Sequence, residues 1–200
     1  MQISNVGKAL LVGACILAGT AGWSQQKAAA PEVSTDIAAT FAVEHSQVVP
    51  SKCCFWLMGG GADAAITFKN GLGAAVAFTG DHASNVTPGV DVNKITIMAG
   101  PRYTWTVPQS KSASQKNYQI FTQGLFGRVH GFNGAYPAMP ALASTANAFA
   151  FQAGAGLNLL CHNNWGVRLL EADYVHSTLP NGSGNLQNDF RISFGVTWHH

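Results

Sequence analysis

Hydrophobic and polar residues alternate with a period of two along most of this chain, and most clearly in its last segment, Asn188 to His200. One set of alternate positions there holds only apolar and aromatic side chains: Phe190, Ile192, Phe194, Val196 and Trp198. Because successive side chains of a β-strand point to opposite faces, the segment predicts a strand with one apolar and one polar face. A strand in the last position of the chain needs a partner on each edge. A barrel closed by its own last strand supplies both partners.

Seven earlier segments repeat this alternation. They predict strands at about residues 37–44, 56–68, 72–78, 95–105, 118–130, 149–159 and 165–176. In the segment 118–130, either face could be the apolar one. Asn70-Gly71 is typical of a tight turn between two antiparallel strands. The sequence therefore predicts an all-β fold, an eight-stranded antiparallel up-and-down barrel.

The connections between these strands fall into two classes. Those after the second and sixth strands are tight (69–71 and 162–164), and the one after the fourth (108–116) is of middling length. Those after the first, third, fifth and seventh are longer and rich in Gly, Pro, Ser and Asn. Short periplasmic turns and longer extracellular loops are typical of transmembrane β-barrels. Aromatic residues near the strand ends fit the girdles of such barrels: Trp56, Phe68, Tyr103, Trp105, Trp165 and Trp198.

Composition favours a transmembrane barrel over a soluble, lipocalin-like one. Charged residues make up 10% of the chain, whereas about a quarter is typical of soluble domains. The net charge of +2 gives no reason to expect nucleic acid as a partner. No apolar run approaches the roughly 18 residues that a membrane helix needs.

The N-terminus has the features of an export signal. Lys8 precedes an apolar stretch at residues 9–19, and small residues flank Trp23, so we expect cleavage after Ser24. A first buried helix and a lipoprotein signal ending at Cys15 are the alternatives. The expected organisation is a signal peptide at 1–24, a flexible lead-in at 25–35 and a barrel domain at 36–200.

Three segments resemble the small OmpA-like outer-membrane β-barrel proteins, the porin-like outer membrane β-barrel domain family. They are Ser193–His200, Met98–Trp105 and Glu171–Tyr174. The resemblance implies an integral protein of the Gram-negative outer membrane, surrounded by outer-membrane lipid and inserted by the barrel-assembly machinery. The signal read by that machinery is implied to include Gly195, Trp198 and His200, with His200 standing where phenylalanine is usual.

The alternation also predicts which charged side chains point into the barrel: Glu44, Asp63, Arg102, Glu171, Asp173 and Arg191. An eight-stranded barrel is just wide enough to be filled by side chains. Buried charges are costly unless they are paired, so we expect a packed network of ion pairs rather than an open channel. A hairpin closing near 177–188 should bring Asp173 opposite Arg191.

Catalytic and metal sites find less support in the sequence. Lipid-modifying barrel enzymes need a nucleophile, a base and an orienting group on one face, whereas His176 and Ser177 are adjacent and His130 has no such neighbour. Four histidines (His45, His82, His130 and His176) fall near the same ends of alternate strands and raise the hypothesis of a metal site. In the expected strand order, a returning strand separates each histidine from the next. The same order places Cys161 at the opposite end of the barrel from Cys53 and Cys54.

We therefore expect a non-catalytic outer-membrane barrel with a structural or surface-interaction role and no cofactor. A lipid-modifying enzyme and a soluble ligand-binding barrel are the alternatives. The sequence does not identify what the extracellular loops bind.

Overall fold

The computed structural model describes residues 33–46, 54–107, 117–138, 141–161, 164–181 and 184–200. The expected signal peptide at 1–24 lies outside these residues, as do most of the lead-in and Cys53. No helix in the described ranges is long and apolar enough to cross a membrane.

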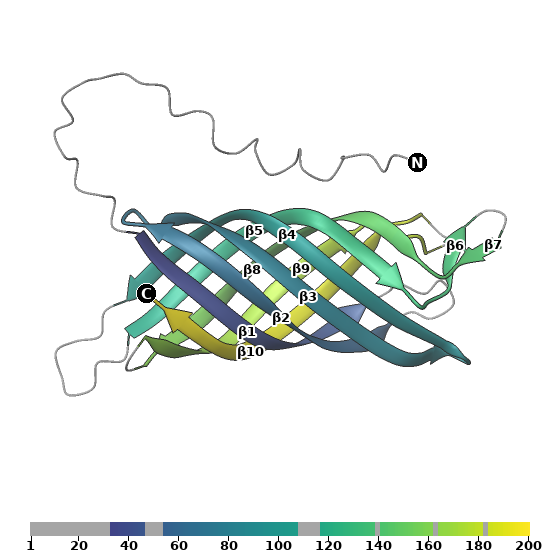
Figure 1. Ribbon diagram of the computed structural model, residues 1–200, viewed down its shortest axis with the longest axis horizontal. Coiled ribbons are helices and arrows are strands. Elements are labelled where there is room, and N and C mark those ends of the chain that lie inside the picture. Colours follow the sequence, from purple (N-terminus) through teal and green to yellow (C-terminus); the bar gives the residue numbers. More distant parts are fainter. Residues whose placement is uncertain (1–32, 47–53, 108–116, 139–140, 162–163, 182–183) are drawn as a thin grey trace, which may run out of the picture. The chain divides into compact units, whose positions relative to one another are not determined.

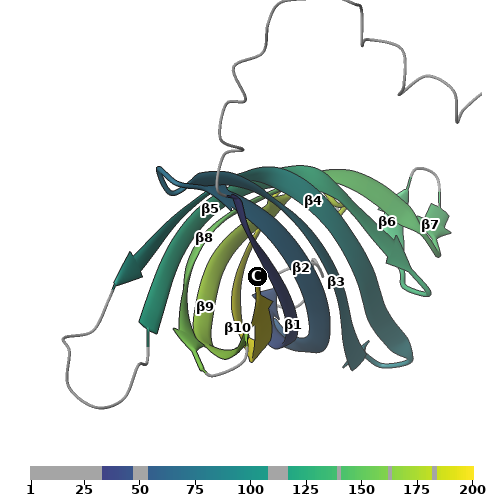
Figure 2. The same ribbon diagram turned by 60° about the vertical axis from the view of Figure 1, so that its left-hand side comes forward.

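Eight long antiparallel strands form a closed transmembrane β-barrel, which confirms the predicted fold (Figure 1). Seen from the second direction, the strands curve round a common lumen (Figure 2). Their order around the barrel is β1-β10-β9-β8-β5-β4-β3-β2, so β10 pairs with β1 and closes the wall. The strands are β1 (Val33–Ser46), β2 (Phe55–Phe68), β3 (Leu72–Thr87), β4 (Val90–Val107), β5 (Asn117–Phe132), β8 (Ala146–Leu160), β9 (Trp165–Ser177) and β10 (Gln187–His199).

The connections define two ends of the barrel. At one end, here called the turn end, β2, β4 and β8 finish at Phe68, Val107 and Leu160. At the other, the loop end, β1, β3, β5 and β9 finish at Ser46, Thr87, Phe132 and Ser177. Cys54 belongs to the loop end and Cys161 to the turn end, as the strand order predicts.

The structure corrects one of the expected loops. The connection after β3 consists of Pro88 and Gly89 alone, because β3 and β4 continue as a hairpin well past the predicted strand ends. Gly89 adopts a φ of 77°, which suits glycine in a tight turn. The register slips between Ala83 and Thr87, so the polar segment that looked like loop is an irregular strand. The loop after β5 carries its own small hairpin, β6 (Tyr136–Ala138) and β7 (Ala141–Ala143).

The two faces of the barrel wall have opposite chemistry. Large apolar side chains cover the outside on every strand, as Trp56 (57% exposed) and Phe194 (52% exposed) illustrate. Charged and amide side chains are buried inside. In β5, whose face the sequence leaves open, Ile120 and Phe126 are exposed, whereas Gln119 is buried. An apolar exterior and polar interior are the reverse of a soluble barrel and match a lipid-facing surface.

Apolar residues close the loop end from within. Phe55, Leu57, Ala83, Val86, Val92 and Tyr136 form one buried cluster there. Tyr136 comes from the β6–β7 hairpin, and its hydroxyl donates to the carbonyl of Asn93 (3.2 Å). Leu179, from the loop between β9 and β10, is buried in a second apolar cluster with Leu125 and Val129. Two loops thus fold inward over the lumen.

The closing seam between β1 and β10 depends on a glycine. A Cβ atom on Gly195 would lie 2.0 Å from the carbonyl oxygen of Ala39. Since Gly195 is the register partner of Thr40, this close approach lies within the pairing that closes the barrel. The glycine of the predicted assembly signal therefore has a packing role of its own.

We expect Gly195→Ala to weaken closure, because the methyl group forces the β1 and β10 backbones apart. Refolding into detergent micelles without any assembly machinery, followed by urea unfolding, measures the effect. Gly80→Ala is the matched control, because a Cβ at Gly80 meets no atom within 4 Å. Equal stability of the two variants would remove the packing role from Gly195.

Lysine at Phe194 should oppose membrane insertion. Phe194 faces outward beside Phe41 (ring centroids 5.5 Å apart), and a lysine near the midplane of such barrels costs about 2–4 kcal/mol. Phe194→Leu, which keeps the surface apolar, should insert normally. The fraction of folded protein recovered in lipid vesicles measures both variants, and normal insertion of Phe194→Lys would reverse the assignment of faces.

Candidate functional site: the charged lumen

All six charged residues predicted to point inward lie buried inside the barrel: Glu44 on β1, Asp63 on β2, Arg102 on β4, Glu171 and Asp173 on β9, and Arg191 on β10. Their exposed fractions are 8% or less. The structure divides most of them between two groups of ion pairs.

The first group, the Asp63 cluster, comprises Asp63, Arg102, Gln123, Arg168 and Glu171. Both guanidinium groups bind the Asp63 carboxylate, Arg102 at 2.7 Å and Arg168 at 2.5 Å. Arg168 also pairs with Glu171 (2.7 Å), and Gln123 accepts from Arg102 and donates to Glu171. The two arginines and two carboxylates balance in charge, which removes the main cost of burying them.

The second group, the Glu44 cluster, comprises Glu44, Asp81, Lys94, Asp189 and Arg191. Lys94 donates to Glu44 and lies 3.3 Å from Asp189. Arg191 donates twice to Glu44 Oε2 (3.0 and 2.7 Å) and lies 3.2 Å from Asp81. The carboxylates come from β1, β3 and β10 and the cations from β4 and β10, so the cluster links four strands across the lumen.

Asp173 and Arg191 are register partners, as the sequence predicts. Their expected ion pair is replaced, however, because the long Arg191 side chain reaches across to Glu44 and Asp81. Asp173 Oδ1 is left without a hydrogen-bond partner among the described residues. Register alone therefore identifies the neighbours but not the ion pair.

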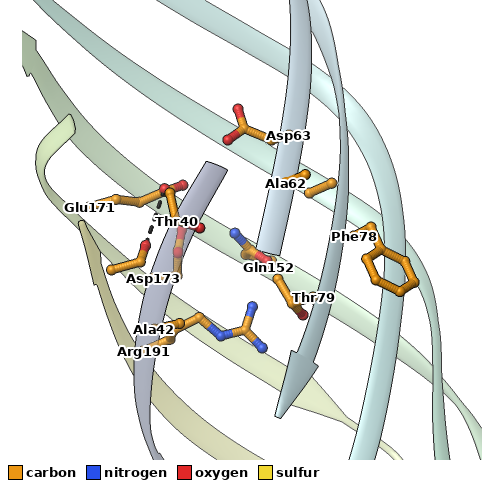
Figure 3. Close-up of a pocket in the computed structure, with 12 residues that line it drawn as sticks. Thr40, Ala42, Ala62, Asp63, Phe78, Thr79, Gln152, Glu171, Asp173 and Arg191 are labelled. Atoms are coloured by element: carbon orange, nitrogen blue, oxygen red, sulfur yellow. Dashed lines mark hydrogen bonds between the residues drawn. The ribbon is translucent and has the colours of Figure 1, made fainter. Parts of the chain in front are cut away.

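A cavity of 20 Å³ lies between the two clusters, and Asp63, Glu171, Asp173 and Arg191 contribute to its lining (Figure 3). Within the described part of the chain, four buried polar atoms that line it have no hydrogen-bond partner: Thr79 Oγ1, Gln152 Oε1, Asp173 Oδ1 and Arg191 Nη1. Two acceptors, one donor and one hydroxyl group match the bonding capacity of a single water molecule, and the volume suits one.

Several inward charges were missed by the sequence analysis although the alternation contains them. Asp36, Asp81, Lys94 and Asp189 are buried and share the parity of the inward residues on their strands. Asp36, Asp81 and Lys94 lie beyond the predicted strand ends, so longer strand boundaries would have found them. Asp189 lies inside the predicted last strand, where its parity with Arg191 already indicates an inward side chain.

Arg168 could not be found by parity. In β9, Leu169 and Leu170 occupy the space opposite Phe194 of β10, because Ser193 pairs with Glu171 and Gly195 with Arg168. This β-bulge adds one residue and exposes both leucines. The bulge reverses the alternation and turns Arg168 inward.

At the turn end, the last residues of the chain pair with the start of β1. His199 Nδ1 lies 2.6 Å from Asp36 Oδ1. The rings of Trp198 and His200 are stacked, and the backbone N–H of His200 donates to Thr35. Recognition of Gly195, Trp198 and His200 by the assembly machinery stays a prediction, because the structure gives only their positions in the folded barrel.

Solved structures show the same architecture. Neisserial surface protein A (NspA) matches with a TM-score of 0.54 and 15% identity over 82% of this chain and 96% of that chain. Ail, the attachment invasion locus protein of Yersinia pestis, matches with a TM-score of 0.50 and 14% identity over 84% and 99%. This chain has the fold of small outer-membrane β-barrels. No protein-family model and no curated protein sequence matches it.

The described residues of this small barrel include no group of three or more His, Cys, Asp or Glu side chains that could hold a metal ion. The four histidines lie near the loop end but on the outer surface, on four different strands. His176 also faces away from the buried Ser177, as expected. Among the described residues, the lumen holds the ion-paired charges of the Asp63 and Glu44 clusters, an arrangement that suits packing.

Arg191→Met should destabilise the barrel by about 3–5 kcal/mol, because Glu44 and Asp81 lose their shared cation in a buried site. Glu44→Gln should lower the free energy of unfolding less in the Arg191→Met variant than in the unaltered protein, because the two residues interact. Adding Asp173→Asn should show a smaller coupling. Urea unfolding of the three single and two double variants in micelles measures both couplings, and a larger coupling with Asp173 would contradict the observed pairing.

Proposed function

We propose that this protein is an integral outer-membrane barrel with a structural or surface-interaction role and a filled lumen that forms no large pore. The observation that supports this most directly is the continuous filling of the barrel interior. The soluble-carrier alternative is incompatible with the apolar outer surface.

The filling can be followed from end to end. Tyr136 and Leu179 lie among apolar side chains toward the loop end, and the Glu44 and Asp63 clusters cross the barrel between strands. Toward the turn end, Gln119 donates to Asp36 and accepts from Asn158. The cavity between the clusters is large enough for one water molecule. This packing supports a rigid barrel rather than a conduit.

The loops are then the surface on which recognition takes place. Their described residues include no Lys or Arg, whereas Leu142 (69% exposed) and Leu186 (60% exposed) are prominent apolar side chains. Ail was solved in complex with the heparin analogue sucrose octasulfate. Binding a sulfated ligand calls for basic side chains, and Lys52, in the expected loop after β1, lies outside the described residues. The exposed leucines of the described loop residues favour an apolar protein surface as partner.

The cellular location is part of the same proposal. Residues 1–24 direct export, the barrel-assembly machinery reads Gly195, Trp198 and His200, and outer-membrane lipid surrounds the apolar face. Aromatic side chains near the turn end, such as Trp105 and Trp165, support a membrane interface there.

Electrophoresis and conductance test the proposal together. Unboiled protein from outer-membrane fractions should migrate differently from boiled protein, because a folded barrel resists SDS. In planar lipid bilayers, the refolded protein should open no large, steady channel. Recovery in the soluble periplasmic fraction would reject the membrane location. A conductance like that of a wide porin would reject the filled lumen.

A further inference from the structure

A side-chain pair recurs on the outer surface at the loop end. In three hairpins, a histidine on the strand that approaches the loop end faces an asparagine on the strand that returns from it. The Nδ1 to Oδ1 distances are 2.7 Å for His82 and Asn93, 2.8 Å for His130 and Asn147, and 2.9 Å for His176 and Asn188. In the hairpin of β1 and β2, Trp56 stands opposite His45.

One of these pairs carries a nucleophile. Ser84 Oγ lies 2.9 Å from His82 Nε2, on the side of the ring opposite Asn93. An asparagine oxygen can only accept, so with Asn93 Oδ1 as partner, Nδ1 of His82 bears the proton and Nε2 accepts from the Ser84 hydroxyl. A serine, a base that can take its proton and a group that orients the base are the three parts of a nucleophilic triad.

We propose that Ser84, His82 and Asn93 form a lipid-facing catalytic triad that hydrolyses ester bonds of membrane lipids. Ser84 is the nucleophile, His82 the general base and acid, and Asn93 the residue that positions the imidazole. The pairs at His130 and His176 keep the histidine and asparagine, but within the described residues neither histidine has a serine hydroxyl bonded to it. They share the surface position without the nucleophile.

The depth of the site in the membrane fits an ester substrate. His82 lies ten residues along β3 from Leu72, and Asn93 lies twelve residues along β4 from Trp105. At 3.3 Å per residue and a strand tilt of about 40°, these segments span about 25–30 Å, the height of the apolar band of such barrels. Leu72 and Trp105 lie at the turn end, which places the triad at the opposite edge of the band, where lipid ester groups meet the polar headgroups.

The neighbouring surface offers a place for an acyl chain. Met58, the register partner of His82, is exposed beside the triad. Phe78 and Ile97 are register partners four residues further along their strands toward the membrane centre, and both are exposed. A lipid lying along these side chains would bring its ester carbonyl toward Ser84. The substrate class is therefore a long-chain acyl ester in the bilayer.

The chemistry balances without any cofactor. Ser84 Oγ attacks the ester carbonyl while His82 Nε2 takes the hydroxyl proton, and His82 then gives that proton to the departing alcohol. Water, deprotonated by His82, then attacks the acyl-serine, and His82 returns that proton to Ser84 Oγ as the carboxylic acid leaves. For the oxyanion, Asn85 is a candidate donor: its Oδ1 accepts from Gly89 N–H, and no described residue accepts from its Nδ2.

The proposal rests on the membrane-barrel function and adds an activity on its outer wall. It also revises the expectation of a non-catalytic protein, which followed from His130 and His176 alone. The β3–β4 hairpin extends past the predicted strand ends, and this extension places His82 opposite Asn93.

The test measures fatty-acid release by the full barrel, refolded into vesicles of phosphatidylcholine with a fluorescent acyl chain. Ser84→Ala and His82→Ala should each lower the rate by on the order of a thousandfold. Asn93→Ala should lower it less, and Asn93→Asp should restore most of it because a carboxylate also accepts from Nδ1. His130→Ala is the matched control: it removes an equivalent surface histidine and should leave the rate unchanged.

Covalent labelling gives a second readout that does not depend on the lipid chosen. An alkyl fluorophosphonate should modify Ser84 in the unaltered protein, detected as a mass increase on its peptide, and should fail with His82→Ala. Heat-modifiable migration establishes that each variant is folded. A folded, inserted barrel that neither releases fatty acid nor reacts at Ser84 would overturn the triad but not the barrel function. Failure of the protein to insert would count against the barrel function itself. Equal loss of activity in His130→Ala would also overturn it.

Discussion

The membrane imposes the constraint on which this structure depends. In hydrocarbon, every backbone N–H and C=O group needs a partner within the protein, and a closed barrel provides one for each strand. Closure runs through the pairing of β1 with β10, where Gly195 allows the two backbones to meet. Because the outer surface must be apolar, the alternation of side chains sends the polar ones inward.

The charges in the polar interior must then be balanced by one another. Buried carboxylates are stable only beside cations or hydrogen-bond donors, and here two arginines share Asp63 while Lys94 and Arg191 share Glu44. These pairs join strands distant in the sequence, so they link the register of the barrel to its charge balance. The same packing that stabilises the wall fills the lumen, so the recognition and chemistry that we propose lie on other surfaces.

Two such surfaces remain, and they differ in character. The described loop residues present apolar side chains, such as Leu142, to the outside. The outer wall near the loop end presents hydrogen-bonded histidines and asparagines at the boundary of the apolar band. A rigid strand scaffold is well suited to hold Ser84, His82 and Asn93 in register, because neighbouring strands fix the distance between facing side chains.

The sequence by itself determined the barrel, its eight strands and the inward direction of six charges, because a period of two is a local property of an extended chain. It did not determine which charges would pair: Arg191 faces Asp173 in register yet binds Glu44 and Asp81 across the lumen. The bulge at Leu169 and Leu170 reversed the position of Arg168, and the long β3–β4 hairpin brought Asn93 beside His82. Bulges, turn positions and cross-lumen contacts depend on how the strands pack together, so only the tertiary structure decides them.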